Sequence, residues 1–294
     1  MRQLTTIKIL LAAGLVAAGL YTPAASAQNI KLAVAANFAT PLNDLITAYQ
    51  TAGWTYSASA SFTVTSGATA TLAGNISTAL AANSSTPYDM LFSADDTTPI
   101  ALHASYPSAV QSPFFYAEGK LVLWSKGPNV SASGYAGFPP SASYSYANGQ
   151  VAIADPNTAP YGTAAQQVLA RVNGITYPNG AYDVKFTQYS TIGTTASAVN
   201  NASSTSTPNM GFIHKSYLCN GTTGAYKSNI SGSYYEYTPA TVAGNPPHDR
   251  ILQDAVVILG GSGSTTDAIN DFAAYVVSTA GKAVIANWCY GVTP

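Results

Sequence analysis

Four turns in the sequence place a helix start directly after a strand-like run, with small or polar residues at the junction. They are centred on Asn37, Thr69, Tyr161-Gly162 and Ile192-Gly193. The first N–H groups of a helix lack partners within the helix, and the helix dipole places about half a positive charge there. Several such ends aimed at one point form an anion site that needs no Lys or Arg. The alternative is that each turn is an ordinary helix start.

The stiffest of these turns is DPNTAPYG, residues 155–162, which follows the apolar run VAIA and precedes the helix-like stretch Thr163 to Arg171. Its prolines and glycine restrict the backbone, and Asp155 is expected to brace the turn through backbone hydrogen bonds. None of its residues is an obvious nucleophile or metal ligand. The remaining chemistry is that of a backbone N–H group, at Tyr161.

Alternating strands and helices are expected to position these turns. Strand, polar turn, helix and strand in succession are typical of βαβ units and a mostly parallel sheet, in which ligands bind outside the carboxyl ends of the strands. The same order in both halves favours two similar lobes. Predicted strands lie at 30–36, 59–65, 88–96, 120–126, 151–154, 184–189, 210–216 and 251–259, and predicted helices at 41–52, 66–76, 163–172 and 266–277.

The first residues predict an exported protein. Arg2 and Lys8 precede and flank an apolar stretch, 9–21, and Ala25-Ser26-Ala27 has the pattern of a signal-peptidase site. Residues 1–27 are therefore interpreted as a cleaved signal peptide, which predicts a soluble, periplasmic mature chain. No later run approaches the ~20 apolar residues of a membrane span.

The composition of the chain limits the classes of partner that it can bind and bears on whether its cysteines are oxidised. Of the 11 basic residues, removal of Arg2 and Lys8 leaves 9 against 12 acidic ones, a net charge of −3 for the mature chain. Without a basic stripe, nucleic acid is not an expected partner. Cys219 and Cys289 are the only cysteines, and an oxidising compartment favours a disulfide between them, although two separate buried thiols stay open.

Other polar residues have simpler interpretations than a catalytic or metal site. Asp95-Asp96 is interpreted as an acidic helix cap rather than a metal or acid–base pair. His103 and His248 have no companion at metal-ligand spacing and are predicted to lie on the surface. Ser66 lacks the flanking glycine pattern of a nucleophile elbow. The stretches 127–149 and 217–248, rich in Tyr, Gly and Ser, are predicted to be loops.

Taken together, the motifs resemble the periplasmic molybdate-binding proteins of ABC transporters over nearly all of the mature chain. The strongest are the FSAD strand end within 88–96 and the D-P-x-x-x-P-x-G turn of 155–162. The others, in chain order, are AVAANFATPLNDL (33–45), GATATLAGNI (67–76), KLVLWSK (120–126), NMGFIHKS (209–216), HDRILQDAVVIL (248–259) and AVIANWCYG (283–291).

The resemblance implies a fold and a set of ligand-binding residues. It implies an α/β periplasmic-binding-protein fold with two lobes, 28–118 plus 252–294 and 119–251, joined by two crossover segments around an oxyanion. Asn37 stands where the family has a serine, and His214 where it has a tyrosine hydroxyl. The other implied contacts are the Thr69 hydroxyl and the backbone N–H groups of Tyr161 and Ile192.

The resemblance also implies a function. The chain is expected to be a monomeric, non-enzymatic protein that captures molybdate or tungstate and delivers it to the permease subunits of an ABC importer. No cofactor is expected, and molybdenum enters only within the bound oxyanion. Because the mapped positions carry donors and no carboxylate, a protonated anion such as hydrogen phosphate is disfavoured. The alternatives are sulfate or another tetrahedral oxyanion, a small organic acid, or a secreted hydrolase.

Overall fold

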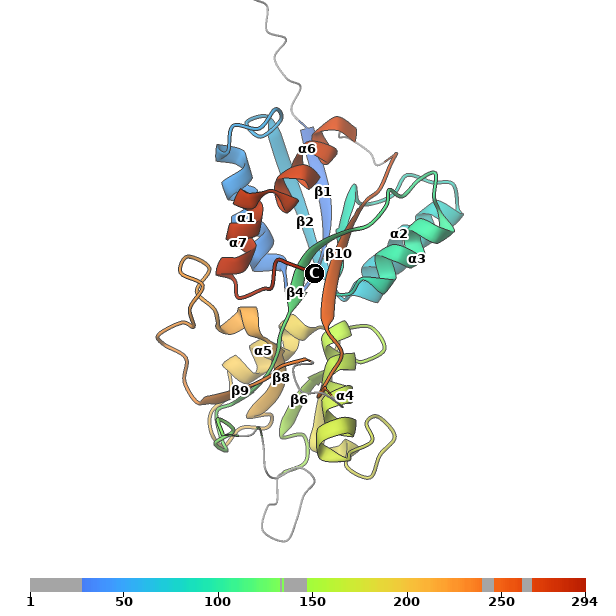
Figure 1. The fold of residues 1–294 in the computed structure, drawn as a ribbon. Coiled ribbons are helices and arrows are strands. Elements are labelled where there is room, and N and C mark those ends of the chain that lie inside the picture. Colours follow the sequence, from blue (N-terminus) through green and yellow to red (C-terminus); the bar gives the residue numbers. More distant parts are fainter. Residues whose placement is uncertain (1–27, 133, 135–146, 240–245, 261–265) are drawn as a thin grey trace, which may run out of the picture.

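The computed structural model describes residues 28–132, 134, 147–239, 246–260 and 266–294; the predicted signal peptide, 1–27, lies outside them. The chain forms two lobes, one above the other in Figure 1, and each has a five-stranded sheet with helices on both faces. Strands β4 and β10 both extend between the upper and the lower lobe, in opposite directions. The cleft between the lobes is therefore bordered by elements from both halves of the sequence.

The sheet of lobe I mixes parallel and antiparallel pairs. Strand β1 pairs in parallel with β2 and β3, and β10 pairs in antiparallel fashion with β3 and β4. As a result, the carboxyl ends of β1, β2 and β3 lie at one edge of the sheet. In sheet order the strands are β2 (Ala60–Gly67), β1 (Gln28–Ala35), β3 (Met90–Phe92), β10 (Ile251–Val257) and β4 (Phe114–Gly119).

Amphipathic helices cover both faces of this sheet. In α1 (Ala39–Thr51), the residues at helical spacing, Leu42, Leu45, Ile46 and Tyr49, are buried as the sequence predicts. On the same face lie α6 (Thr266–Val277) and α7 (Thr279–Asn287), whereas α2 (Thr69–Ala81) and α3 (Thr97–Ser105) cover the opposite face.

Lobe II repeats this plan. Strand β6 pairs in parallel with β7 and β8, and β5 pairs in antiparallel fashion with β8 and β9. Helices α4 (Pro160–Asn173) and α5 (Ile192–Asn200) pack on the two faces. In sheet order the strands are β7 (Phe186–Tyr189), β6 (Val151–Ala154), β8 (Met210–His214), β5 (Leu121–Ser125) and β9 (Ser233–Tyr237), and short 3-10 helices span Asp183–Lys185 and Lys215–Leu218.

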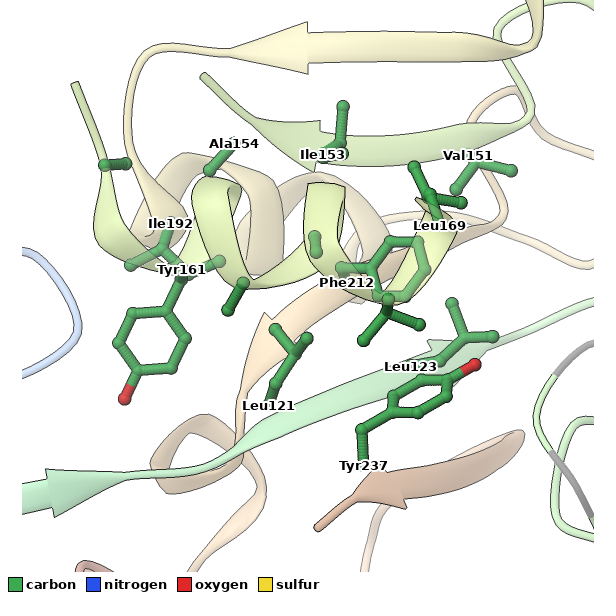
Figure 2. Close-up of a cluster of buried hydrophobic side chains, with 14 of the residues drawn as sticks. Leu121, Leu123, Val151, Ile153, Ala154, Tyr161, Leu169, Ile192, Phe212 and Tyr237 are labelled. Carbon is green, nitrogen blue, oxygen red and sulfur yellow. The ribbon is translucent and has the colours of Figure 1, made fainter. Parts of the chain in front are cut away.

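The apolar core of lobe II reaches the cleft. Figure 2 shows Leu121, Leu123 and Phe212 packed beneath α4, with Tyr161 and Ile192 at one end of the cluster. Ala35 and Ala94 of lobe I belong to the same buried cluster. The two lobes therefore share apolar contacts where the predicted ligand-binding turns lie.

A disulfide and an ion pair add connections between chain segments that are distant in sequence. Cys219, after β8, is bonded to Cys289, after α7, with the Cα atoms 6.2 Å apart. The disulfide therefore joins lobe II to the C-terminal segment of lobe I. Near the crossover, the guanidinium of Arg250 donates to both carboxylate oxygens of Glu118, at 2.9 and 2.7 Å.

Several sequence-based expectations were wrong. Strand β4 and helix α7 were not predicted, and β9 lies within 217–248, which was expected to be a loop. Most of the other predicted loop, 127–149, lies outside the described residues. His248 is fully buried rather than on the surface, because its ring nitrogens lie 2.7 and 2.9 Å from the carbonyl oxygens of Asp249 and Tyr237.

Candidate functional site

A small cavity lies between the two lobes, where the first turns of helices from each lobe meet. Four of the five predicted ligand-binding residues line it: Asn37 and Thr69 from lobe I, and Tyr161 and Ile192 from lobe II. Its volume of about 10 Å³, counted as room for the centre of a water molecule, is close to what one water needs. No charged side chain is among its described lining residues, which otherwise include Ala35, Ala36, Gly67, Ala68, Ala94, Ala159, Pro160 and Thr191.

His214 lies in a neighbouring and larger cavity of about 490 Å³. The two cavities share part of their lining, including Asn37 and Thr191, so the larger one adjoins the smaller. Lys227 is the one charged residue among the described residues that line the larger cavity. A ligand that occupies both spaces would contact all five predicted positions.

Asn37 lies in the turn between β1 and α1, and Phe38 rather than Asn37 occupies the N-cap position. Its side chain is 1% exposed. As placed, Nδ2 donates to Oε1 of Gln253 and to the hydroxyl of Tyr290, both at 3.0 Å, and Oδ1 is buried without a hydrogen-bond partner. As placed, the atom without a partner is an acceptor, whereas an amide turned by 180° presents the NH2 donor at the same position.

Thr69 is the first residue of α2 and is buried. Its Oγ1 accepts a hydrogen bond from the Ala94 N–H at 3.1 Å, which leaves the hydroxyl proton able to donate. The next residue bridges the lobes, because the N–H of Ala70 donates to the carbonyl of Thr158 at 3.3 Å. The lobes therefore touch beside the small cavity.

Tyr161 is held by the turn that the sequence singled out. Oδ1 of Asp155 accepts from the Asn157 N–H at 2.9 Å, and the Asp155 carbonyl accepts from the Ala159 N–H at 2.9 Å, so Asp155 braces the turn as predicted. A Cβ atom at Gly162 would lie 2.5 Å from the carbonyl oxygen of Ala154, so the close approach of α4 to β6 requires glycine there. The Tyr161 N–H lies in the first helical turn, next to the cavity.

Ile192 begins α5 in a similar way. Thr191 is the N-cap, and its Oγ1 accepts from the N–H of Thr194 at 3.1 Å in a reciprocal capping box. The Thr191 side chain therefore accepts from the N–H of Thr194, the third residue of the helix. Ile192, the first residue of the helix, lines the small cavity. Figure 2 shows Ile192 beside the ring of Tyr161, whose hydroxyl points out of the cluster.

His214 ends β8 and is 5% exposed. Burial, and secondarily the charge of Lys227, lowers the pKa of its imidazole to about 3. The ring is therefore neutral at ordinary pH and donates from one nitrogen at most. Nδ1 lies 2.6 Å from Oγ of Ser216, and the ring lies edge-on to Tyr161 and Tyr217.

The depressed pKa of His214 predicts a loss of stability at mildly acidic pH. Between the ordinary pKa of about 6.5 and the folded value, the unfolded chain binds a proton that the folded chain does not, so stability falls as pH falls. From pH 6.5 to 5 the expected loss from this group is about 2 kcal/mol. Asp254, whose pKa burial raises to about 6, acts in the opposite direction. Urea unfolding of the wild type and His214→Gln at pH 6.5 and at pH 5 isolates the histidine. The free energy of unfolding of the wild type minus that of the variant should be about 2 kcal/mol greater at pH 6.5 than at pH 5, and an equal difference at the two pH values contradicts the prediction.

A third cavity, of about 340 Å³, opens on the other side of Thr69 and includes carboxylates in its lining. Asp95 caps α3, since its Oδ1 accepts from the N–H of Thr98 at 2.7 Å, as the sequence predicts. Within the described ranges, no group of His, Cys, Asp and Glu residues has the arrangement to hold a metal ion. Arg250 at this cavity is paired with Glu118.

Residues behind the small cavity were missed by sequence reasoning. Gln253, Tyr116 and Tyr290 are buried and hydrogen-bonded to the site, either directly or through one another. The one available signal was Gln253, which with Asp254 interrupts the otherwise apolar run of 251–259. Lys227 lies in a stretch of low complexity and carried no signal.

Comparisons with known proteins show the family to which the chain belongs. Residues 30–290 match the family described as bacterial extracellular solute-binding protein. The molybdate-binding protein ModA of Azotobacter vinelandii is 30% identical over 277 residues, which cover 94% of each chain. The protein of that name from Rhodobacter capsulatus is 33% identical over 157 residues, 52% of this chain and 54% of its own length.

The solved structure of the Azotobacter vinelandii periplasmic molybdate-binding protein superposes with a TM-score of 0.67 at 23% identity, and the alignment covers 90% of this chain and 100% of that one. This likeness confirms the predicted two-lobed α/β fold. In the part of the chain that the structure describes, no helix is long and apolar enough to cross a membrane. The chain belongs to the family of bacterial extracellular solute-binding proteins, and it is therefore a binding protein rather than an enzyme.

Proposed function

We propose that this chain captures molybdate outside the inner membrane and delivers it to the permease subunits of an ABC importer. The observation that carries the proposal is the convergence of uncharged donor groups from both lobes on one buried cavity, at Asn37, Thr69, Tyr161 and Ile192. The name of the Azotobacter relative, a molybdate-binding protein, supports the choice of ligand. Tungstate, an oxyanion of the same shape and charge, is proposed as a second ligand of a monomeric protein with a cleaved 1–27 signal peptide.

The size of the cavity implies movement on binding. Room for about one water is less than a tetrahedral anion with four oxygens requires. The lobes, with proposed boundaries at 118/119 and 251/252, must therefore part to admit the anion and close again around it. Closure strengthens charge-assisted hydrogen bonds because water leaves the site.

The arginines favour an inorganic anion over an organic acid. A carboxylate ligand usually calls for a bidentate arginine. Arg171 and Arg250 are instead paired with Asp249 and Glu118, at 2.8 and 2.7 Å. Neither arginine lines the two cavities that hold the predicted ligand-binding residues.

Isothermal titration of the mature protein tests the proposal. Molybdate and tungstate are each titrated into the protein, with sulfate and hydrogen phosphate as controls of the same tetrahedral shape. Tight binding of molybdate and weak or absent binding of the controls is the expected result. Binding of sulfate alone, or of none of these anions, overturns the proposed ligand.

The role of His214 is open to a direct measurement. Its ring lines the larger cavity and is neutral, so the predicted contact is a single N–H donor. His214→Ala is expected to weaken molybdate binding by at least about 1 kcal/mol, the worth of one hydrogen bond. Titration calorimetry measures the change, and an unchanged dissociation constant means that the ring does not contact the anion.

Lys227 is expected to speed the arrival of the anion. Its Nζ donates to the carbonyl of Tyr217 at 2.6 Å, which fixes a positive charge at the wall of the larger cavity. Lys227→Met should lower the association rate constant for molybdate roughly fivefold at low salt, with a smaller effect at high salt. The matched control is Lys185→Met, which removes the same charge outside both cavity linings. Equal rates for both variants in stopped-flow measurements contradict the steering role.

A further inference from the structure

A buried hydrogen-bond network lies directly behind the small cavity and contacts it through Asn37 and Tyr161. Gln253 of β10 is at its centre, and Tyr116 of β4 and Tyr290 near the C-terminus complete it. All of these side chains are at least nine-tenths buried. One face of the network is therefore part of the proposed oxyanion site, and the other lies among the strands that cross between the lobes.

Gln253 contacts a predicted ligand-binding residue from each lobe. Its Oε1 lies 3.0 Å from Nδ2 of Asn37 and 2.9 Å from the hydroxyl of Tyr116, and its Nε2 lies 3.1 Å from the hydroxyl of Tyr161. An amide carries donors on one side and an acceptor on the other. The direction in which Gln253 points therefore dictates the direction of the Asn37 amide.

The hydrogen bonds of Tyr116 and the unpaired oxygen of Asn37 together favour one direction. The Tyr116 hydroxyl has one proton, and it lies 2.7 Å from the carbonyl oxygen of Ser93, which can only accept. With the proton there, the hydroxyl oxygen can still accept, and a Gln253 NH2 group at 2.9 Å gives this contact a proton of its own. The Gln253 oxygen then accepts from Tyr161.

The amide of Asn37 must turn together with that of Gln253. Its oxygen then faces the NH2 of Gln253 and the hydroxyl of Tyr290, whose proton it shares with the main-chain carbonyl of Asn37 at 2.8 Å. The Ser216 hydroxyl, 2.9 Å from that of Tyr290, also donates to this carbonyl at 3.2 Å. The NH2 of Asn37 takes the position that otherwise holds Oδ1 without a partner. In the opposite orientation the single Tyr116 proton is shared between the Ser93 carbonyl and the Gln253 oxygen, and a lone acceptor stays buried at Asn37 beside the cavity.

We propose that Gln253 is a positioning residue that holds the Asn37 amide with its donor side toward the ligand, and thereby excludes protonated oxyanions. The inference rests on the proposed function. With Nδ2, the Thr69 hydroxyl and backbone N–H groups around it, the anion meets donors alone. Hydrogen phosphate carries an O–H that needs an acceptor, whereas sulfate and molybdate do not.

Gln253→Glu reverses this arrangement. A carboxylate only accepts, so it draws the NH2 of Asn37 toward itself and turns the Asn37 oxygen to the ligand. Sulfate and hydrogen phosphate are matched probes, because above neutral pH both are dianions of similar size that differ by one proton. The added negative charge weakens the binding of both anions to a similar degree. A change in the ratio of their affinities therefore shows that the Asn37 amide has turned.

Each anion competes with bound molybdate in titrations of the wild type, Gln253→Glu and Gln253→Met. In Gln253→Glu, the affinity for hydrogen phosphate divided by that for sulfate is expected to rise at least about tenfold above its wild-type value. Gln253→Met, of similar length without polar atoms, should show a smaller gain. Loss of affinity for both probes without a change in their ratio, or no gain for hydrogen phosphate, overturns the role. Absence of molybdate binding to the wild type instead overturns the proposed function.

A measurement on the unaltered protein covers the case in which a variant does not fold. In ¹⁵N-resolved spectra, the side-chain NH2 signals of Asn37 should shift on addition of molybdate, because Nδ2 gains an oxyanion acceptor. The NH2 signals of Gln253, which face the network, should shift much less. Asn37 NH2 signals that do not respond to bound molybdate contradict the proposed orientation.

Discussion

Asn37→Asp is expected to weaken molybdate binding by about 1,000-fold, or about 4 kcal/mol. The change removes an N–H donor and places a carboxylate against a dianion in a buried space, where an unpaired charge costs about 3–5 kcal/mol. Asn37 is 1% exposed and lines both cavities, so water cannot screen the repulsion. Titration calorimetry at neutral pH measures the change.

The matched control for this prediction is Asn37→Ser. Serine keeps a hydroxyl donor at the same position and stands there in the family that the sequence resembles. We expect its affinity for molybdate to stay within about tenfold of the wild type, since one donor replaces another. Thermal unfolding of both variants shows whether the fold persists. Binding by Asn37→Asp at wild-type strength would remove Asn37 from the site.

Removal of the disulfide is expected to lower the free energy of unfolding by about 4 kcal/mol on the chain-entropy model. Cys219 and Cys289 are 70 residues apart, and the bond excludes the extended conformations of that long loop from the unfolded chain. The double variant Cys219→Ser, Cys289→Ser isolates the effect, and urea unfolding at neutral pH measures it.

The wild type treated with a thiol reductant is the parallel sample for this experiment. It should unfold at the same urea concentration as the double variant, because both lack only the cross-link. A difference of less than about 1 kcal/mol between the oxidised wild type and the double variant would mean that native-state strain or residual structure cancels the entropic gain.

Helices with a regular apolar spacing, and strands followed by stiff turns, could be predicted from the sequence. Leu42, Leu45 and Tyr49 gave α1, and the 155–162 turn gave the start of α4, because local pattern and tertiary packing agree there. Strand β4 was missed because apolar and polar residues do not alternate in FFYAEG. This segment becomes a strand by pairing with β10, which comes more than a hundred residues later in the sequence. Pairing between strands so distant in the sequence cannot be predicted from a local residue pattern.

The residues of the site likewise fall into those that could be predicted from the sequence and those that could not. Asn37, Thr69, Tyr161 and Ile192 could be placed together because each follows a strand whose carboxyl end faces the cleft, which topology alone requires. Gln253 could not, since Asp254 follows it in an otherwise apolar run and the sequence does not show which of these two polar side chains faces the site. The structure shows that the face with Gln253 lies against the site.

The cross-link between Cys219 and Cys289 changes what the two halves can do relative to each other. Two peptide crossings alone would permit both bending and twisting between the halves, whereas a third covalent tie removes a degree of freedom. Any movement of the proposed kind must then keep Cys219 and Cys289 within bonding distance. In an oxidising compartment the bond therefore restricts the proposed opening of the lobes. A reductant would remove this restriction without altering any residue that lines the two cavities.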